Sequence, residues 1–547
     1  MTIVKEKETK DMGQCRFFSV ILCPIRHINK PKTKSNMKKN MLLLPLMAMM
    51  IGCTSTEKEA ENNPVLTIEG GQISGVQCSV PTGDGSGTTT YYAYKGIPYA
   101  AAPIGDLRWK EPQPVKPWEG VRLCDKFGHP GYQAVHYPGF YASEWGYGDE
   151  APYSEDCLYL NVYTKAAGQV DKKLPVAMWI HGGGYREGWG SEPEFDGEQW
   201  ALKDVVLVTI NYRLGIFGFM TYPELSAESP NHVSGNYGIL DQIQSLKWIK
   251  ANIAQFGGDP DNVTIFGQSA GAGSVRTLCE SPLARGLFHK AVIMSGGGLN
   301  IPPKDGEEAK PATPVNKFFF YNPTLAESEA ETKKVMDWAG LTDLEKLRNA
   351  STEIMYTVGQ LYNMVNKSDL FLMQRPIVDG YVCTKTFDDA AREGTIADIP
   401  YMIGYTLNDM GSMAPGIAEF CKVREEKGGK AWAYEFARPL PDDGKHPEIT
   451  DRLKGAFHSS DLWFVFKSLK HCWRPWTQGD WDLSEKMLTA WTNFAKYSDP
   501  NGDTSADSQP SALNWQPCTA EAPQFMLFKL DANDAEASEM GEPIMPN

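Results

Sequence analysis

Gly267-Gln268-Ser269-Ala270-Gly271 is the stretch of sequence that decides the fold. The apolar and β-branched run 263–266 precedes it and predicts a buried parallel strand. The small residues 270–275 follow it and predict the start of a helix. A serine between the two sits on a sharp strand-to-helix turn, a nucleophile elbow, where only small neighbours fit. The turn predicts that the Ser269 hydroxyl is lifted above a parallel sheet.

A second glycine-rich stretch, His181-Gly182-Gly183-Gly184-Tyr185, follows the apolar run 176–180, which predicts another strand. Gly183 and Gly184 have no Cβ, so their N–H groups can turn toward one point. The N–H of Ala270 lies at a predicted helix N-terminus, where donors are unpaired and the dipole favours an anion. We expect these three residues to form an oxyanion hole. Either motif alone fits an ordinary tight turn, but the two in this order predict acyl transfer through a serine.

A nucleophilic serine needs a base, and the base needs an acid that orients it. In α/β-hydrolases the acid and then the histidine follow the serine along the chain. Only His446, His458 and His471 lie far enough downstream. His458 is favoured because it stands in a loop that enters an apolar helix. His446 lies in a polar run typical of a solvated loop, and His471 beside Cys472 and Trp473 fits a packing role.

Further motifs of the chain resemble the type-B carboxylesterases, the family that includes the cholinesterases. The resemblance covers about residues 65–530. The segments that carry it are Tyr94–Ala100, Leu107–Trp109, Ser154–Val162, Asn211–Gly215, Gly235–Ser274, Gly455–His458 and Trp491–Ala495. It implies an α/β-hydrolase fold, with a mostly parallel central sheet flanked by helices and with lid insertions. It also implies hydrolysis of a small carboxylic ester through an acyl-enzyme intermediate, without a metal or cofactor.

The resemblance assigns roles to residues of the site. Ser269 matches the nucleophile of the family and His458 matches the general base. Gly183, Gly184 and Ala270 match the oxyanion donors.

The acid of the triad departs from the family pattern. The family usually has a glutamate followed by glycine, five residues after a glycine that ends a strand. Asp409 lies five residues after Gly404 and is expected to be the acid, with Met410 in the usual glycine position. If Asp409 only caps a turn, Asp461 and Asp379 are the alternatives.

Two other departures concern charge and cysteine pairing. Gln268 stands where many relatives carry glutamate, so a cationic substrate has less to hold it. Cys157 usually pairs with an upstream cysteine, and Gly131 occupies that position here. The family's first disulfide is therefore expected to be missing, unless Cys124 takes the place of the absent partner. Without that disulfide, Cys157 is a buried thiol.

The N-terminal sequence predicts where the protein is located. Residues 37–53 begin with a basic stretch, continue with a short apolar run and end in a sequence that resembles a bacterial lipobox at Cys53. The apolar run is too short to span a bilayer. An ordinary signal peptide with a chance cysteine is the alternative. We expect residues 1–36 to be absent from the mature protein, 54–64 to be a flexible tether, and 65–547 to form a single domain. The protein is expected in a bacterial cell envelope, lipid-anchored on the periplasmic or surface face.

Composition excludes some classes of function. The net charge of −15 argues against nucleic-acid binding, and none of the eleven cysteines has the spacing of a zinc site. One alternative function is that of a catalytically silent binding protein, but such members of the family characteristically lose the serine, which this chain keeps. A second alternative is a hydrolase that cleaves an amide, thioester or lactone. The sequence leaves the oligomeric state open.

Aromatic residues and charge patterns predict the surroundings of the site. Trp145, Tyr147, Tyr185 and Trp189 are expected chiefly in core packing, with lining of a substrate gorge as the alternative. The charged segment 300–375 is expected to supply lid helices. The other predicted elements are a hairpin region over Val65–Val80 and Tyr91–Tyr94, parallel strands over Val176–Ile180, Val205–Ile210, Val263–Phe266 and Ala291–Met294, and an amphipathic helix from Ile239 to Ile253.

Overall fold

The computed structural model describes residues 63–82, 87–134, 144–145, 152–301, 321–366, 374–446, 453–503 and 513–544. Residues 1–36 and 37–53, Cys53 and Tyr147 lie outside the described residues, as does nearly all of 54–64. The lipid anchor therefore stays a prediction. Within the described ranges, no helix is both long enough and apolar enough to cross a bilayer.

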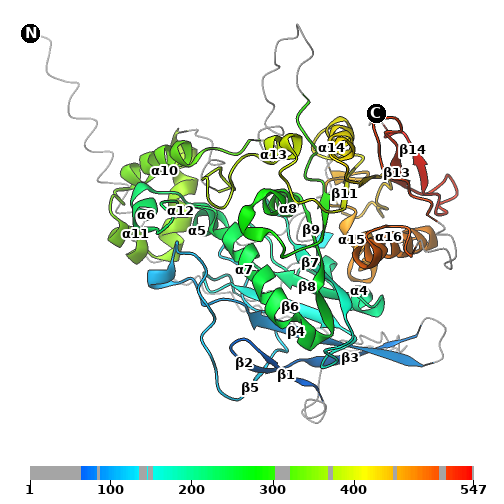
Figure 1. Ribbon diagram of the computed structural model, residues 1–547, viewed down its shortest axis with the longest axis horizontal. Helices are drawn as coiled ribbons and strands as arrows, with labels where there is room; N and C mark the ends of the chain where they lie inside the picture. Colours follow the sequence, from blue (N-terminus) through cyan, green and yellow to red (C-terminus); the bar gives the residue numbers. More distant parts are fainter. Residues whose placement is uncertain are drawn as a thin grey trace, which may run out of the picture. The chain divides into compact units, whose positions relative to one another are not determined.

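The described chain is built on an eleven-stranded mixed sheet of strand order β14-β13-β12-β11-β10-β9-β7-β8-β6-β4-β3 (Figure 1). The seven strands from β8 to β13 in this order run parallel to one another. They are β8 (Val206–Ile210), β7 (Leu174–Ile180), β9 (Gly258–Gln268), β10 (Lys290–Met294), β11 (Tyr401–Thr406), β12 (Ala431–Phe436) and β13 (Phe525–Phe528). The antiparallel strands at the edges are β6 (Tyr159–Thr164), β4 (Thr88–Pro98), β3 (Val76–Pro81) and β14 (Glu539–Gly541).

The four central strands expected from the sequence are present, and β9 begins five residues before the expected Val263. The predicted hairpin region divides into two antiparallel hairpins in different sheets. β3 and β4 extend the large sheet, whereas β1 (Val65–Ile68), β2 (Gly71–Ser74) and β5 (Val121–Leu123) form a separate three-stranded sheet. Gly70 and Gly71, which both have positive φ, make the tight turn that separates β1 from β2.

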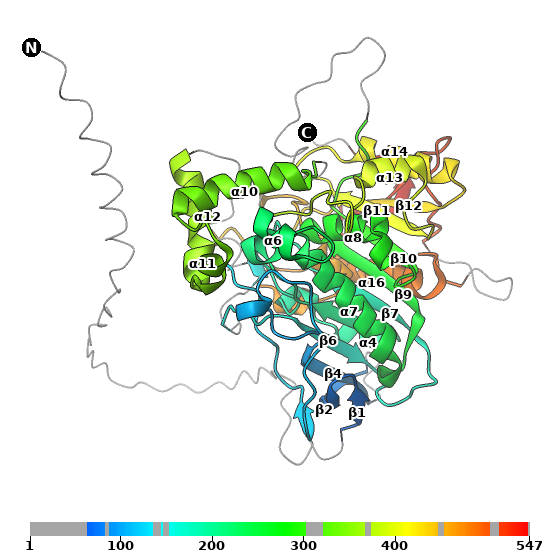
Figure 2. The ribbon, with the colours of Figure 1, turned by 60° about the vertical axis from the view of Figure 1, so that its left-hand side comes forward.

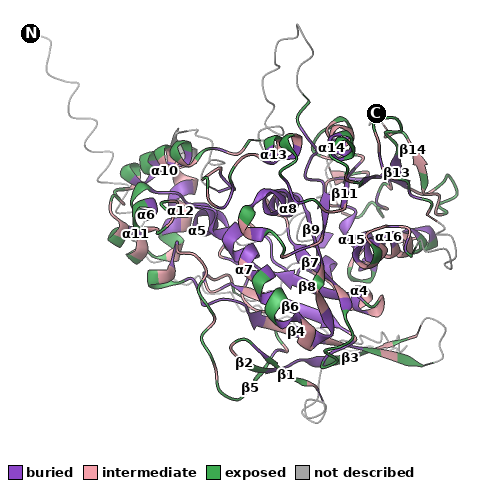
Figure 3. Ribbon diagram, in the orientation of Figure 1, coloured by how far each residue is buried: buried purple, intermediate pink, exposed green. Residues whose placement is uncertain are grey.

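The sheet is covered on both faces, because alternate side chains of its strands enter different cores. Val176, Met178 and Ile180 of β7 belong to one buried cluster, and Ala177 and Trp179 belong to the other. The first cluster includes α7 (Tyr237–Asn252), α8 (Ala270–Glu280), α13 (Phe387–Glu393) and α14 (Ala414–Glu426). The second includes α4 (Glu198–Leu202), α15 (Leu462–Val465) and α16 (Gln478–Tyr497). Figure 3 shows the central strands of the large sheet as the most continuously buried part of the ribbon.

The helix expected from Ile239 to Ile253 is α7, which begins two residues earlier and passes into a short 3-10 turn at its end. The other α-helices in the described part of the chain are α5 (Gly215–Phe219), α6 (Pro223–Glu228), α10 (Leu325–Ala339), α11 (Leu344–Asn349) and α12 (Thr352–Asn366). The 3-10 turns are η1 (Gly105–Leu107), η2 (Pro193–Phe195), η3 (Ile253–Phe256), η4 (Pro282–Ala284) and η7 (Leu469–His471).

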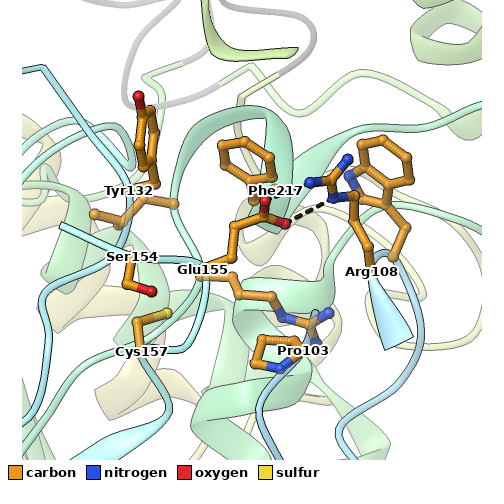
Figure 4. Close-up of a pocket in the computed structure, with 10 residues that line it drawn as sticks. Pro103, Arg108, Tyr132, Ser154, Glu155, Cys157 and Phe217 are labelled. Atoms are coloured by element: carbon orange, nitrogen blue, oxygen red, sulfur yellow. Dashed lines mark hydrogen bonds and ion pairs between the residues drawn. The ribbon is translucent and has the colours of Figure 1, made fainter. Parts of the chain in front are cut away.

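The charged segment expected to supply lid helices forms α10, α11 and α12, which lie together at one side of the sheet (Figure 2). The motifs Leu107–Trp109 and Ser154–Val162 meet where these helices join the rest of the domain. Arg108 makes a two-pronged ion pair with Glu155, with Nε 2.7 Å from Oε2, and both side chains are buried (Figure 4). Arg108 also donates to the Ala350 carbonyl oxygen at 2.7 Å, and the Thr352 hydroxyl donates to Glu155. The pair therefore ties α11 and α12 to the body.

Replacing Arg108 by methionine is expected to lower the free energy of unfolding by about 3–5 kcal/mol, because Glu155 would remain buried without its counter-ion. Urea unfolding followed by circular dichroism measures this loss. The matched control is Lys333→Met, which removes a cation from the exposed pair with Asp337 and is expected to leave the midpoint unchanged. Equal shifts in the two variants would contradict a special role for the buried pair.

The cysteine expectation is confirmed within the described residues. Cys124 and Cys157 are both buried and both free, so Cys124 does not replace the missing partner. Burial raises the pKa of the Cys157 thiol far above its usual value, which makes this sulfur an inert part of the core.

Candidate active site

The carboxyl ends of the central parallel strands meet at one edge of the sheet. Ile180 at the end of β7 pairs with Gly267, and Met294 at the end of β10 pairs with Gln268. The N–H of Ser269 donates to the Met294 carbonyl oxygen at 2.9 Å, so the turn after β9 is fixed to the neighbouring strand. The loops that follow these strands therefore gather around Ser269.

Ser269 occupies a strained backbone conformation, with φ 57° and ψ −121°. This region is costly for a residue with a side chain and persists only where the surroundings impose it. A Cβ at Gly271 would lie 2.0 Å from the Ile180 carbonyl oxygen, and one at Gly267 would lie 2.6 Å from the Gly271 carbonyl carbon. The two glycines are therefore required for the bend that the sequence predicted.

The glycine run after β7 lies against this bend. A Cβ built on Gly182 would be 3.2 Å from the Cβ of Ser269. Gly183 and Gly184 both have positive φ, of 92° and 63°. A Cβ at Gly183 would also meet the Glu187 carbonyl oxygen at 2.1 Å. Ala270 is the first residue of α8 and follows Ser269 directly. The three expected oxyanion donors therefore lie on two neighbouring turns, the glycine run after β7 and the elbow after β9.

His458 and Asp409 are joined by a short hydrogen bond, with Nδ1 2.6 Å from Oδ1. The Asp409 side chain is fully covered, whereas the His458 side chain keeps 19% of its surface exposed. The loops that carry them are tied together, because the Asn408 N–H donates to the Ala456 carbonyl oxygen at 2.9 Å. The Ala456 N–H in turn donates to Asn408 Oδ1 at 3.0 Å. The two residues thus meet although they are far apart in sequence.

The charges of this pair support each other. Burial would raise the pKa of Asp409, but the charge and hydrogen bond of His458 outweigh it and hold that pKa below its usual value. Burial would lower the pKa of His458, but the Asp409 carboxylate outweighs it and raises that pKa above its usual value. The ionised carboxylate accepts from Nδ1–H, so the neutral ring has its lone pair on Nε2.

Gln268 connects this pair to the elbow. Its Nε2 lies 3.2 Å from Nε2 of His458, so its amide donates to the ring nitrogen that carries the lone pair. The sequence pattern marked Gln268 only as a lost negative charge. Its contact with His458 was missed, because the two residues are 190 positions apart and no local pattern links them.

The other candidate histidines are engaged elsewhere. The ring of His446 stacks on Trp473 with centroids 3.6 Å apart. His471 Nε2 lies 2.9 Å from the carboxylate of Asp196.

The alternative acids also have other partners. Asp379 Oδ1 accepts the N–H groups of residues 381–383, and its Oδ2 accepts from Asn236 at 2.9 Å. Asp461 is buried and accepts from the Tyr434 hydroxyl at 3.0 Å. Burial raises the pKa of Asp461 to about 7. Among the three carboxylates considered, Asp409 is the one hydrogen-bonded to His458.

A pocket with a cavity volume of about 30 Å³, open to solvent on one side, has Ser269 and Ala270 in its wall. Tyr185 also lines this pocket, which agrees with the alternative prediction that it lines a substrate gorge. Trp145 packs its ring edge-on to Phe457, and the ring of Trp189 lies against Tyr153. These tryptophans are buried, in agreement with the core-packing prediction.

Charged side chains of this pocket were not predicted. Arg276, Glu280 and Arg375 line it, and each is more than nine-tenths buried. The first two follow from their places on α8, but Arg375 comes from a distant loop that no sequence pattern connects to the site. No group of histidine, cysteine, aspartate and glutamate in the described ranges could hold a metal ion.

Comparisons with known proteins agree with this geometry. The model of the Carboxylesterase family matches residues 62–427 and 414–542. The chain is 36% identical to the para-nitrobenzyl esterase of Bacillus subtilis (strain 168), over 83% of this chain and 95% of that protein. It is 35% identical to the fumonisin B1 esterase of Sphingopyxis macrogoltabida, over 74% of this chain and 69% of that protein.

Solved structures give the same result. A PNB esterase superposes with a TM-score of 0.68 at 26% identity, covering 88% of this chain and 97% of that one. A carboxylesterase of Geobacillus stearothermophilus superposes with a TM-score of 0.65 at 28% identity, covering 87% and 97%. The α/β-hydrolase fold expected from the sequence is thereby confirmed. The chain belongs to the carboxylesterase family and is a carboxylic ester hydrolase.

Proposed function

We propose that the protein hydrolyses small carboxylic esters through a covalent acyl-enzyme, with Ser269 as nucleophile, His458 as general base and Asp409 as the acid that orients it. The observation that carries the proposal is the 2.6 Å hydrogen bond between Asp409 and Nδ1 of His458. The other ring nitrogen, Nε2, contacts Gln268, the residue directly before Ser269. The Asp409–His458 half of this arrangement supports a serine triad, and the mechanism requires the Ser269 hydroxyl to take the place of the Gln268 amide at Nε2 of His458.

The reaction follows from the protonation states. Nε2 of His458 takes the Ser269 proton as the hydroxyl oxygen attacks the ester carbonyl carbon. The N–H groups of Gly183, Gly184 and Ala270 stabilise the negative charge on the tetrahedral oxygen, and losing one such donor costs about 3–4 kcal/mol. The imidazolium then protonates the leaving alcohol. Water attacks the acyl-enzyme with His458 as base, which returns the serine.

A fluorophosphonate probe and a pair of substrates test this proposal. We expect the probe to label the native chain on the peptide that contains Ser269. An ester and the amide of the same acid separate ester hydrolysis from the hydrolysis of another acyl bond, and we expect the ester to react faster. An unlabelled chain would instead indicate a catalytically silent binding protein.

Gln268→Glu is expected to move the acid limb of the kcat/KM profile to higher pH by about one unit. A carboxylate beside Nε2 favours the imidazolium and raises the pKa of His458, and the imidazolium cannot accept the Ser269 proton. Activity at pH 6 should therefore fall more than activity at pH 8. A series of kcat/KM values against pH measures the shift. Gln516→Glu, a change at an exposed position, is the control that should leave the limb in place; an unmoved limb in the Gln268 variant would contradict the contact.

We also propose that the enzyme is anchored by lipid on Cys53 in a bacterial cell envelope. The basic segment, the short apolar run and the lipobox-like end at Cys53 support this. Cys53→Ser is expected to move the activity from the membrane fraction to the soluble fraction after cell breakage. Retention of the variant in the membrane fraction would contradict lipidation at this residue.

A further inference from the structure

The pocket beside Ser269 runs along one face of α8. Gly273, Arg276, Thr277 and Glu280 line it at the spacing of residues on one side of a helix. The six residue steps from Ala270 to Arg276 correspond to about 9 Å along the helix axis. The pocket therefore offers contacts to parts of a substrate that lie well beyond the bond to be cleaved.

The wall of this pocket carries hydrogen-bond donors. The side chains of Arg276 and Arg375 are buried, at 5% and 6% exposure. Tyr185 lines the same pocket as the two arginines. Burial raises the pKa of Tyr185 to about 12, and the two guanidinium groups oppose this rise. A Cβ on Gly273 would lie 2.3 Å from the Tyr185 hydroxyl, which places this hydroxyl over the first turn of α8.

Carboxylates balance the two cations. Arg276 pairs with Asp388 at 3.0 Å and donates to the Gly296 carbonyl oxygen at 2.7 Å. Glu280 supplies the second negative charge. Its Oε1 accepts the N–H of Thr384 at 2.9 Å, whereas its Oε2 is buried without a hydrogen-bond partner among the described residues. Two guanidinium and two carboxylate groups leave this part of the site formally neutral, and the pocket wall carries both donors and an acceptor.

We propose that this pocket receives a neutral, hydroxylated part of the ester, such as a sugar or polyol unit. A hydroxyl group both donates and accepts, so it can accept from a guanidinium and donate to a carboxylate. A bare hydrocarbon group would desolvate these polar groups without replacing their hydrogen bonds. A charged group would disturb the balance of the two cations and two anions. The inference rests on the proposed function, because Ser269 defines the reacting end of the pocket.

Matched esters test the inference on both sides of the ester bond. On the alcohol side, a butyrate ester of methyl glucoside is compared with cyclohexylmethyl butyrate. On the acyl side, methyl quinate is compared with methyl cyclohexanecarboxylate and with the monomethyl ester of cyclohexanedicarboxylic acid. We expect the hydroxylated member to have a kcat/KM at least about tenfold higher in one of the two sets, the size of a hydrogen bond to a charged group.

Variants locate the origin of the preference. Arg375→Met and Glu280→Gln should each lower the ratio of kcat/KM for the hydroxylated ester to that for the bare ester. Lys385→Met is the control, because it removes a neighbouring cation that pairs with Glu393 and does not line the pocket. A loosened loop would lower both rate constants together and leave the ratio unchanged, which would overturn the assignment.

The outcomes separate this inference from the proposed function. Fluorophosphonate labelling of Ser269 with a preference for the bare or the carboxylate-bearing ester would overturn the inference alone. Failure of that labelling would overturn both. Labelling with a hydroxylated preference that the Arg375 and Glu280 variants lose, and the Lys385 variant keeps, would support both.

Discussion

Ser269→Ala is expected to lower kcat for ester hydrolysis by about a million-fold, the loss typical of a removed triad serine. The alanine has no oxygen to attack the carbonyl carbon, so the acyl-enzyme cannot form. Alanine differs from serine by one oxygen, and the strain of the bend is set by the backbone, so the fold should persist. Release of a chromophoric alcohol from an activated ester measures the loss.

Ser281→Ala is the matched control for this variant. Ser281 lies just after the far end of α8, is buried, and its hydroxyl has no hydrogen-bond partner among the described residues. The same change there should leave kcat within twofold of the wild type. Turnover retained in the Ser269 variant would assign the nucleophile to another residue.

Asp409→Asn is expected to lower kcat by up to about ten-thousand-fold, as for the acid of a serine-protease triad. The amide presents an N–H where the carboxylate accepted from Nδ1–H, so the ring takes the tautomer that places its proton on Nε2. Loss of the negative charge also lowers the pKa of His458. The acid limb of the residual activity should therefore move to lower pH, which a change in folding alone would not produce.

Asp461→Asn distinguishes the two buried carboxylates near His458. Asp461 bonds to Tyr434 and not to the imidazole ring, so its replacement should cost far less than that of Asp409. Steady-state kinetics on one activated ester compares the two variants. A larger loss at Asp461 would transfer the role of the acid to that residue.

The elements around the elbow could be predicted from sequence because their signals are local. A β-branched run, a glycine on each side of Ser269 and a run of small residues specify the strand, the bend and the helix within a dozen positions. The same is true of the glycine run after β7. Asp409 needed the family resemblance, since its spacing from Gly404 has meaning only against a known pattern.

The rest of the site depends on long-range packing. The Gln268 contact with His458 and the place of Arg375 in the pocket arise from loops that meet only in the folded chain. The buried Arg108–Glu155 pair joins two motifs that the sequence shows as separate matches. The division of the N-terminal hairpins between two sheets likewise depends on which strands they pair with, and not on their own alternation.

The covalent intermediate itself gives the most direct test of the proposed mechanism. The wild-type chain is mixed with an excess of an activated ester, quenched in acid within the first turnover, digested and examined by mass spectrometry. We predict up to one acyl group per chain, carried by the peptide that contains Ser269, together with a burst of alcohol of the same stoichiometry. An acyl group on another peptide, or full turnover with neither a burst nor a trapped acyl group, would contradict catalysis through Ser269.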